Sequence, residues 1–266
     1  MKDISIIVPL YNEEKVFSSL YSSLVSVIDV VPFACEVIMV NDGSSDNTAS
    51  LIKDLCARDK RFTGVLLSRN FGHQIAVTAG LAQVRGRKGA MIIDGDLQDP
   101  PELVADFYKL LEEGYDVIYA VRQKRKEGFL KRMAYWSYYR LLKSISKQQI
   151  PLDSGDFSML SRRVVDHMNA MPEQSRYLRG MRSWVGFKQK AYVYNRDERQ
   201  AGETKYSWKK LFELAFNGIF NFSDFPVRLI SRIGFFTILL AMGYLVYILT
   251  RKIFFGDVPQ GFTTLI

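Results

Sequence analysis

The stretch "GAMIIDGDLQDPPELVADFYKLLEEG" (89–114) decides the fold expected for this chain. It opens with a short apolar run, continues with three aspartates and two prolines, and ends in an amphipathic segment of helical length. The short apolar run before turn-forming residues is typical of a buried strand. The stretch therefore predicts a strand, a polar loop and a helix, in that order.

The same unit recurs through the first half of the chain. Strands are predicted over 4–10, 35–41, 62–68, 89–94 and 115–121, and helical patterns such as 14–28 and 101–114 lie between them. This alternation predicts an α/β fold, Rossmann-like, with a mostly parallel sheet and helices on both faces. Ligands of such sheets bind beyond the carboxyl ends of the strands.

Polar motifs follow the predicted strands at those ends. They are "YNEE" (11–14), "NDGSSDNT" (41–48), "DGDLQD" (94–99) and "RQKRK" (122–126). No Gly-x-Gly-x-x-Gly follows the first strand, where a dinucleotide-binding fold needs glycine for backbone approach to a pyrophosphate. An oxidoreductase that uses NAD or FAD is therefore not expected.

The aspartates of "DGDLQDPP" (94–101) fall into two groups. Asp99 precedes a proline and is predicted to cap the following helix. Asp94 and Asp96 flank a glycine at the strand end, where two carboxylates repel unless a cation lies between them, which suits Mg²⁺ or Mn²⁺. Asp42, at the exit of the second strand, is placed to hydrogen-bond a base or a ribose.

Composition narrows the classes of partner and compartment. The 266 residues can bury one substantial core, and 36 Lys and Arg against 28 Asp and Glu give a formal charge of +8. Such a charge suits a nucleotide, a phosphate, a nucleic acid or an acidic membrane surface. Cys35 and Cys56 lack metal-ligand spacing, and a disulfide scaffold is not expected, which favours a reducing compartment.

The C-terminal part reads as membrane-embedded. "IGFFTILLAMGYLVYILT" (233–250) holds no charged residue and would span about 27 Å as a helix, close to the hydrocarbon thickness of a bilayer. We predict an amphipathic juxtamembrane helix over 207–228 and a transmembrane helix over 229–250. Residues 251–266 are expected to form a loop and the start of a second, truncated transmembrane helix.

A basic segment indicates a surface at the membrane interface. In "RQKRKEGFLKR" (122–132) six residues are basic and one is acidic, and the aromatic, amphipathic stretch "MAYWSYYRLL" (133–142) follows. Basic residues beside such helices are typical of an interfacial surface. This surface accounts for the net charge, so nucleic acid is not expected as a partner.

Several motifs in one order resemble a known family. "VPLYNEE" (8–14), "NDGSSDNT" (41–48), "DGDLQDPPE" (94–102), "SGDF" (154–157) and "GETKYS" (202–207) resemble those of the family-2 inverting glycosyltransferases with the GT-A fold. More narrowly, they resemble the polyprenyl-phosphate glycosyltransferases, the group of dolichol-phosphate mannose synthase and the bacterial undecaprenyl-phosphate glucosyltransferases. "SRNFGHQIAVTAGL" (68–81) and "RYLRGMRSWVGF" (176–187) resemble the bacterial branch.

The resemblance implies roles for individual residues. It implies that the nucleoside is held by Pro9, Tyr11, Glu13 and Asp42, and that the metal ion and the sugar-nucleotide diphosphate are bound by Asp94, Asp96 and Gln98. It implies phosphate contacts for Arg122, Arg199 and Lys205, and it matches Asp156 to the family's candidate catalytic carboxylate. Contact with the acceptor phosphate or the membrane surface is expected of Arg125, Lys126, Lys131 and Arg132.

The function implied is transfer of a sugar, glucose first, from a UDP-sugar to undecaprenyl phosphate with inversion. The product would be a lipid-linked donor for cell-envelope glycans, made by a catalytic domain (1–206) that faces the cytoplasm at the inner membrane. Other donors, namely GDP-mannose, UDP-GlcNAc or a UDP-modified pentose, remain open, as does the choice between monomer and homo-oligomer. A processive polysaccharide synthase, whose Gln-x-x-Arg-Trp motif is not found here, and a membrane-anchored nucleotide-sugar sensor are the alternatives.

Overall fold

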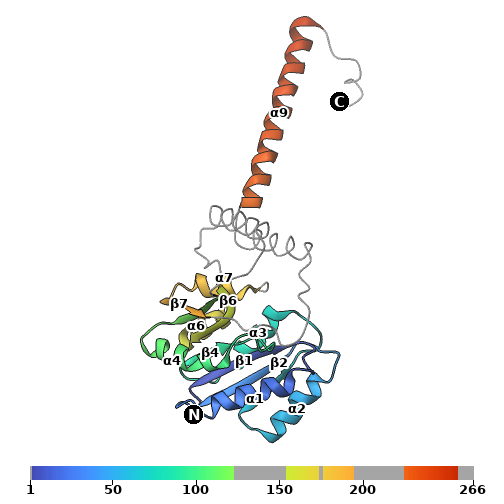
Figure 1. Cartoon of the computed structure of the whole chain (residues 1–266). Helices are drawn as coiled ribbons and strands as arrows, with labels where there is room; N and C mark the ends of the chain where they lie inside the picture. The colour runs from blue at the N-terminus through green and yellow to red at the C-terminus, as the bar shows by residue number, and fades with distance from the viewer. Residues whose placement is uncertain (1, 123–153, 174–175, 195–224, 257–266) are drawn as a thin grey trace, which may run out of the picture. The chain divides into compact units, whose positions relative to one another are not determined.

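The computed structural model describes residues 2–122, 154–173, 176–194 and 225–256 (Figure 1). These residues belong to two compact units. The first unit contains all described residues up to 194, and the second contains the long helix α9 (Phe225–Phe255).

The first unit is built on a seven-stranded sheet with the order β3-β2-β1-β4-β6-β5-β7. Its strands are β1 (Ile4–Leu10), β2 (Cys35–Asn41), β3 (Phe62–Leu66), β4 (Gly89–Ile92), β5 (Val117–Arg122), β6 (Ser154–Ser161) and β7 (Gln189–Tyr194). The first four strands run parallel to one another, and β7 runs parallel to β5. Strand β6 is antiparallel to both β4 and β5. The sheet is therefore mostly parallel, as predicted, with one reversed strand inside it.

Helices cover both faces of this sheet (Figure 1). They are α1 (Phe17–Ile28), α2 (Thr48–Arg58), α3 (His73–Leu81), the 3-10 helix η1 (Pro101–Leu103), α4 (Val104–Glu112), α6 (Arg162–Ala170) and α7 (Leu178–Trp184). Successive residues of a strand point to opposite faces. Ile6 and Val8 of β1 accordingly join the core formed with α1 and α4, whereas Ile7 joins the core formed with α3, α6 and α7.

Element bounds follow the sequence closely where a strand is central and apolar. Strands β1 and β2 have the predicted bounds, and every residue of both is buried. Strands β3 and β4 end at 66 and 92 rather than at 68 and 94, and β5 begins at 117 rather than at 115. The helix predicted over 14–28 begins at Phe17. The carboxylate of Glu14, before the helix, accepts hydrogen bonds from Asn47.

Strands β6 and β7 were not predicted from the sequence. Strand β7 lies at the sheet edge, and most of its residues are at least partly exposed, so it lacks the continuous apolar run of a central strand. Strand β6 carries the "SGDF" motif at its start, where polar residues and a glycine obscure the strand pattern. The motif therefore begins a strand at the centre of the sheet.

Helix α9 contains a segment long and apolar enough to cross a membrane, Val227–Phe254, with a mean hydropathy of 2.1. Only 6% of its most apolar window is buried. The helix extends beyond the predicted 229–250 at both ends, so 251–255, expected as loop, are helical. Backbone hydrogen bonds within a helix do not depend on side-chain charge, and the polar Arg251 and Lys252 therefore continue it. Residues 207–224 and 257–266 lie outside the described residues.

Candidate active site

The loops that follow β1 and β2 are joined by hydrogen bonds. Asn12, in a left-handed conformation with φ of 56°, accepts a hydrogen bond at its side-chain oxygen from the backbone N–H of Ser45 at 2.8 Å. Its own N–H donates to the hydroxyl of Ser44 at 3.0 Å, and the N–H of Glu13 donates to the hydroxyl of Thr48 at 3.0 Å. The motifs "YNEE" and "NDGSSDNT" thus form one polar structure at the carboxyl ends of two neighbouring strands.

Asp42 fixes the segment that leads into α3. Its two carboxylate oxygens accept hydrogen bonds from the backbone N–H groups of Phe71 at 2.8 Å and Gly72 at 2.9 Å. The adjacent Gly43 has φ of 63°, and a Cβ atom there would lie 2.1 Å from the carbonyl carbon of Arg69. The two segments therefore approach so closely that only glycine fits at 43.

The other residues expected to hold a nucleoside lie at the same sheet edge. Pro9 is within β1, buried and opposite Val40, and Tyr11 directly after β1 has 47% of its surface exposed. The backbone of Glu13 is fixed by the neighbouring loop. The roles of these residues and of Asp42 in nucleoside binding stay predictions.

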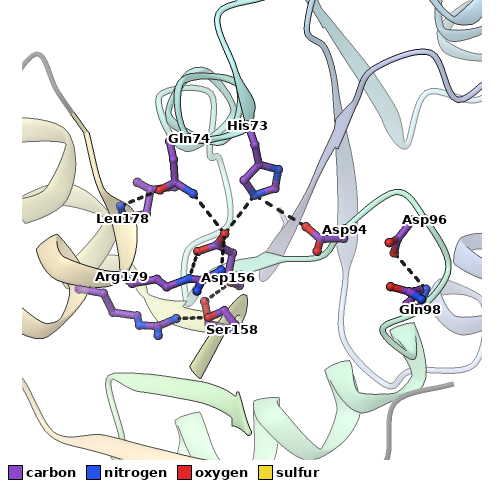
Figure 2. A network of polar contacts seen from close by, with 11 residues as sticks. His73, Gln74, Asp94, Asp96, Gln98, Asp156, Ser158, Leu178 and Arg179 are labelled. Atoms are coloured by element: carbon purple, nitrogen blue, oxygen red, sulfur yellow. Dashed lines mark hydrogen bonds and ion pairs between the residues drawn. The ribbon is translucent and has the colours of Figure 1, made fainter. Parts of the chain in front are cut away.

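The antiparallel pairing of β4 and β6 brings two acidic residues together. Ile92 lies opposite Ser158 in this ladder. Extending the register by two residues places Asp94, beyond the end of β4, opposite Asp156 near the start of β6. Figure 2 shows His73 between them. Its Nε2 atom lies 3.3 Å from Asp156 and 3.7 Å from Asp94.

Asp156 is held by side chains from two helices. Arg179 of α7 donates from Nε at 2.8 Å and from Nη2 at 3.2 Å to its two oxygens. The amide nitrogen of Gln74, in the first turn of α3, donates to it at 3.1 Å. The amide oxygen of Gln74 accepts from the N–H of Leu178 at 2.8 Å (Figure 2). The carboxylate thus connects β6, α3 and α7.

These contacts set the charge states of the site. Burial alone would raise the pKa of Asp156, but the charge and hydrogen bonds of Arg179, with His73, hold that pKa well below its usual range. Burial raises the pKa of Asp94 to about 6, and nearby carboxylates add to this increase. Burial opposes the charged form of His73, yet Asp156 and Asp94 raise its pKa. Asp156 is therefore ionised throughout the ordinary pH range.

Asp96 and Gln98 lie on the other side of Asp94 from Asp156 (Figure 2). The backbone N–H of Gln98 donates to Asp96 at 3.1 Å around Leu97, which has φ of 57°. Among the described residues, no three His, Cys, Asp or Glu side chains are grouped as a complete metal site. The neighbouring carboxylates of Asp94 and Asp96 nevertheless fit Mg²⁺ or Mn²⁺, which take few protein ligands and complete their shells with phosphate oxygens and water.

Asp99 does not cap the following helix, contrary to the prediction. Pro100 occupies the cap position of η1, and no side chain there accepts a capping hydrogen bond. Asp99 is 1% exposed and accepts a hydrogen bond from the hydroxyl of Tyr194, at the end of β7. A buried carboxylate needs a donor, and the distant tyrosine supplies one that the local sequence does not reveal.

Other predicted site residues lie at or beyond the limits of the described structure. Arg122 is the last residue of β5. The predicted phosphate and membrane contacts at Arg125, Lys126, Lys131, Arg132, Arg199 and Lys205 fall outside the described residues. These assignments stay predictions.

Sequence reasoning did not assign His73, Gln74 or Arg179 to the site. All three lie within quoted motifs, "SRNFGHQIAVTAGL" and "RYLRGMRSWVGF". The available signal was the polar His-Gln pair placed directly before an apolar helical segment. Nothing in the local pattern of Arg179 distinguishes it from Arg182, the other arginine of α7.

The sequence is similar to those of known glycosyltransferases. The sequence profile described as Glycosyl transferase family 2 matches residues 5–168. A Bacillus subtilis (strain 168) protein named Uncharacterized glycosyltransferase YkcC is 43% identical over 263 residues, covering 98% of this chain and 81% of that protein. The Bactoprenol glucosyl transferase of Shigella phage SfX is 34% identical over 264 residues, covering 99% and 86%.

A solved structure supports the fold. Glucosyl-3-phosphoglycerate synthase from Mycobacterium tuberculosis, in complex with Mn²⁺, UDP and phosphoglyceric acid, aligns with a TM-score of 0.53 and 18% identity. The alignment covers 82% of this chain and 76% of that one. The sheet with helices on both faces is therefore that of a GT-A glycosyltransferase, and the profile match extends over more than half of the chain. The chain belongs to glycosyltransferase family 2.

Proposed function

We propose that this glycosyltransferase transfers glucose from UDP-glucose to undecaprenyl phosphate, with inversion at the anomeric carbon. The observation that carries the proposal is the meeting of Asp94 and Asp156 at one edge of the sheet. It places the residue proposed for the donor diphosphate beside the residue proposed for the acceptor. Relatives named bactoprenol glucosyl transferase, aligned over 99% of the chain, and the apolar helix α9 support a lipid-linked acceptor.

The donor is proposed to bind across the ends of β1, β2 and β4. Its nucleoside would contact Tyr11 and the segment held by Asp42, and Asp94, Asp96 and Gln98 would hold the divalent ion and the diphosphate. A bound Mg²⁺ or Mn²⁺ would offset the negative charge that develops on the departing diphosphate. Further phosphate contacts are proposed for Arg122, Arg199 and Lys205.

Asp156 is proposed to orient rather than to deprotonate. A phosphate monoester has its second pKa near about 6 and is mostly dianionic at neutral pH, so its oxygen can attack without a general base. The low pKa of Asp156 makes it a weak proton acceptor. Its four donor contacts instead suit a fixed negative charge.

The protein is proposed to act at the inner membrane, with its catalytic unit facing the cytoplasm. The basic residues Arg125, Lys126, Lys131 and Arg132 would meet the acidic surface of the membrane there. The product would then serve as a lipid-linked glucose donor for cell-envelope glycans.

The test is a transfer assay with the full chain in detergent micelles. Labelled UDP-glucose, Mn²⁺ and undecaprenyl phosphate should give a solvent-extractable glucosyl lipid of inverted anomeric configuration. Parallel reactions with GDP-mannose, UDP-GlcNAc and a UDP-pentose identify the donor, and activity with one of these alone would overturn the glucose assignment. UDP should also raise the unfolding temperature more than GDP does, because the preferred nucleotide binds the folded protein more tightly.

A further inference from the structure

Arg179 is the exposed partner of a buried ion pair. The side chain of Asp156 has 8% of its surface exposed, whereas that of Arg179 has 37%. Two hydrogen bonds, from Nε and Nη2 to the two carboxylate oxygens, hold the guanidinium against Asp156 in the bidentate geometry that is common for arginine and carboxylate. Of this pair, the cation is therefore the group that solvent, and a bound ligand, can reach.

Gln74 links Asp156 to the start of the helix that carries Arg179. Gln74 donates to Asp156 and accepts from the N–H of Leu178, the residue before Arg179. The first turn of α3 thus fixes both the carboxylate and the start of the helix that carries the guanidinium. Burial opposes the charged form of Arg179, but the charge and hydrogen bonds of Asp156 raise the pKa of the guanidinium.

The acceptor of the proposed reaction needs such a cation. A phosphate dianion that approaches Asp94 and Asp156 meets two carboxylates, and like charges repel strongly where water is scarce. A guanidinium presents a planar set of donors that matches phosphate oxygens. Arg179 would therefore offset the repulsion between Asp156 and the nucleophile, as the proposed divalent ion would at Asp94.

We propose that Arg179 binds the phosphate of the lipid acceptor, and that Asp156 acts through it by positioning its guanidinium. This assignment rests on the proposed function. An unprotonated phosphate oxygen attacks the anomeric carbon, and the bond from that carbon to the diphosphate oxygen breaks. Its electron pair leaves with the nucleotide diphosphate. The new glycosyl phosphodiester has one negative charge fewer than the acceptor, and the released nucleotide has one more, so no proton transfer is required.

The experiment measures steady-state kinetics of the full chain in micelles, with UDP-glucose and undecaprenyl phosphate varied in turn. Arg179→Gln should raise the KM for the lipid phosphate by about tenfold or more, the loss expected for one charge-assisted contact. The KM for UDP-glucose should stay within about twofold of that of the wild type. Arg179→Lys keeps the charge but loses the planar set of donors. Its KM for the lipid phosphate should therefore lie between that of the wild type and that of Arg179→Gln.

Arg162→Gln is the matched control. Arg162 also pairs with an aspartate, Asp166, but it follows the opposite end of β6 from Asp156. This variant should leave both KM values within about twofold of those of the wild type, since an exposed ion pair contributes little.

A double variant separates positioning from a direct role of Asp156. Removing Arg179 alone leaves the buried charge of Asp156 without its arginine partner, whereas Asp156→Asn with Arg179→Gln removes both charges of the pair. If Asp156 acts through Arg179, the double variant should be no worse in acceptor KM than Arg179→Gln alone. Additive losses would overturn the positioning role.

Two further outcomes distinguish failure of the Arg179 assignment from failure of the proposed function. An unchanged acceptor KM in active, UDP-protected Arg179 variants would overturn the phosphate assignment while leaving the proposed function intact. Absence of transfer by the wild type, despite normal UDP protection, would overturn the proposed function and this role together.

Discussion

At the scale of single residues, the charge state of Asp156 is set by the side chains around it. Arg179 and His73 keep its pKa well below the range in which enzymes work, so its charge does not change near neutral pH. Asp156→Asn should therefore keep measurable transfer, with its loss mainly in the KM for the acceptor. Profiles of kcat against pH should show the same acidic limb near pH ~6 in both forms, from the acceptor phosphate. A limb that disappears in the Asn variant, or a folded variant with no turnover, would instead indicate a general base.

Asp96 and Asp99 should separate by substitution, although they lie in one loop. Asp96→Ala should abolish transfer and the dependence of UDP binding on Mn²⁺, with little change in stability. Asp99→Ala should destabilise the fold by roughly 1–3 kcal/mol, because it leaves the buried hydroxyl of Tyr194 without its acceptor. Urea unfolding and UDP titration with and without Mn²⁺ measure the two effects, and Tyr194→Phe tests the same contact from its other side. If Asp99 proved essential for transfer and Asp96 dispensable, the division of roles between the two residues would be wrong.

At the scale of elements, the close approach of the loop after β2 to the segment before α3 depends on Gly43. Gly43→Ala should cost more than about 1 kcal/mol and weaken UDP binding, because a Cβ atom would displace the backbone at Arg69. Gly114→Ala is the matched control, since Gly114 also has positive φ, 87°, but nothing lies within 4 Å of its Cβ position. Equal costs measured by urea unfolding would show that backbone strain, not the approach of the loops, restricts position 43.

The ion pair between Asp116, directly before β5, and Arg163 of α6 should make stability depend on acid. Burial would raise the pKa of Asp116, but the hydrogen bonds of Arg163 and Ser161 lower it below 3.8. The pair therefore stabilises the fold above about pH 4, and this contribution is lost as the pH falls through the folded-state pKa. Urea midpoints should fall less steeply with acid in Asp116→Asn than in the wild type. The exposed-pair variant Asp166→Asn should follow the wild-type curve, and a parallel curve for Asp116→Asn would contradict the linkage.

At the scale of the whole molecule, α9 should govern attachment to the membrane. Leu240 lies near the middle of the apolar segment, where an arginine costs about 2.5–3.5 kcal/mol in a bilayer. Leu240→Arg should therefore reduce the fraction of the chain that resists alkaline extraction from membranes. Leu229→Arg, near one end of the same segment, should have little effect, because its side chain can reach the interface. Equal extraction of both variants would show that α9 does not cross the bilayer.

Much of the fold could be predicted because its signals are local. Runs of buried β-branched residues fix β1 and β2, and an uncharged run of 18 residues marks the core of α9. The strand ends, and with them Asp42, Asp94 and Asp96, follow from the alternation of strands and helices. Hydrophobic periodicity depends only on near neighbours, which is why these features are visible in the sequence.

The composition of the site was decided by the tertiary structure. The reversed strand β6 places Asp156 beside Asp94, and Gln74 and Arg179 reach Asp156 across 82 and 23 positions of sequence. Asp99, which reads as a helix cap, contacts Tyr194 across 95 positions. By itself the sequence determined strands β1 to β5, the family motifs and the apolar segment. The charge state and partners of Asp156 depend on strand order, because hydrogen bonds between distant segments form only when the folded sheet brings their donors and acceptors together.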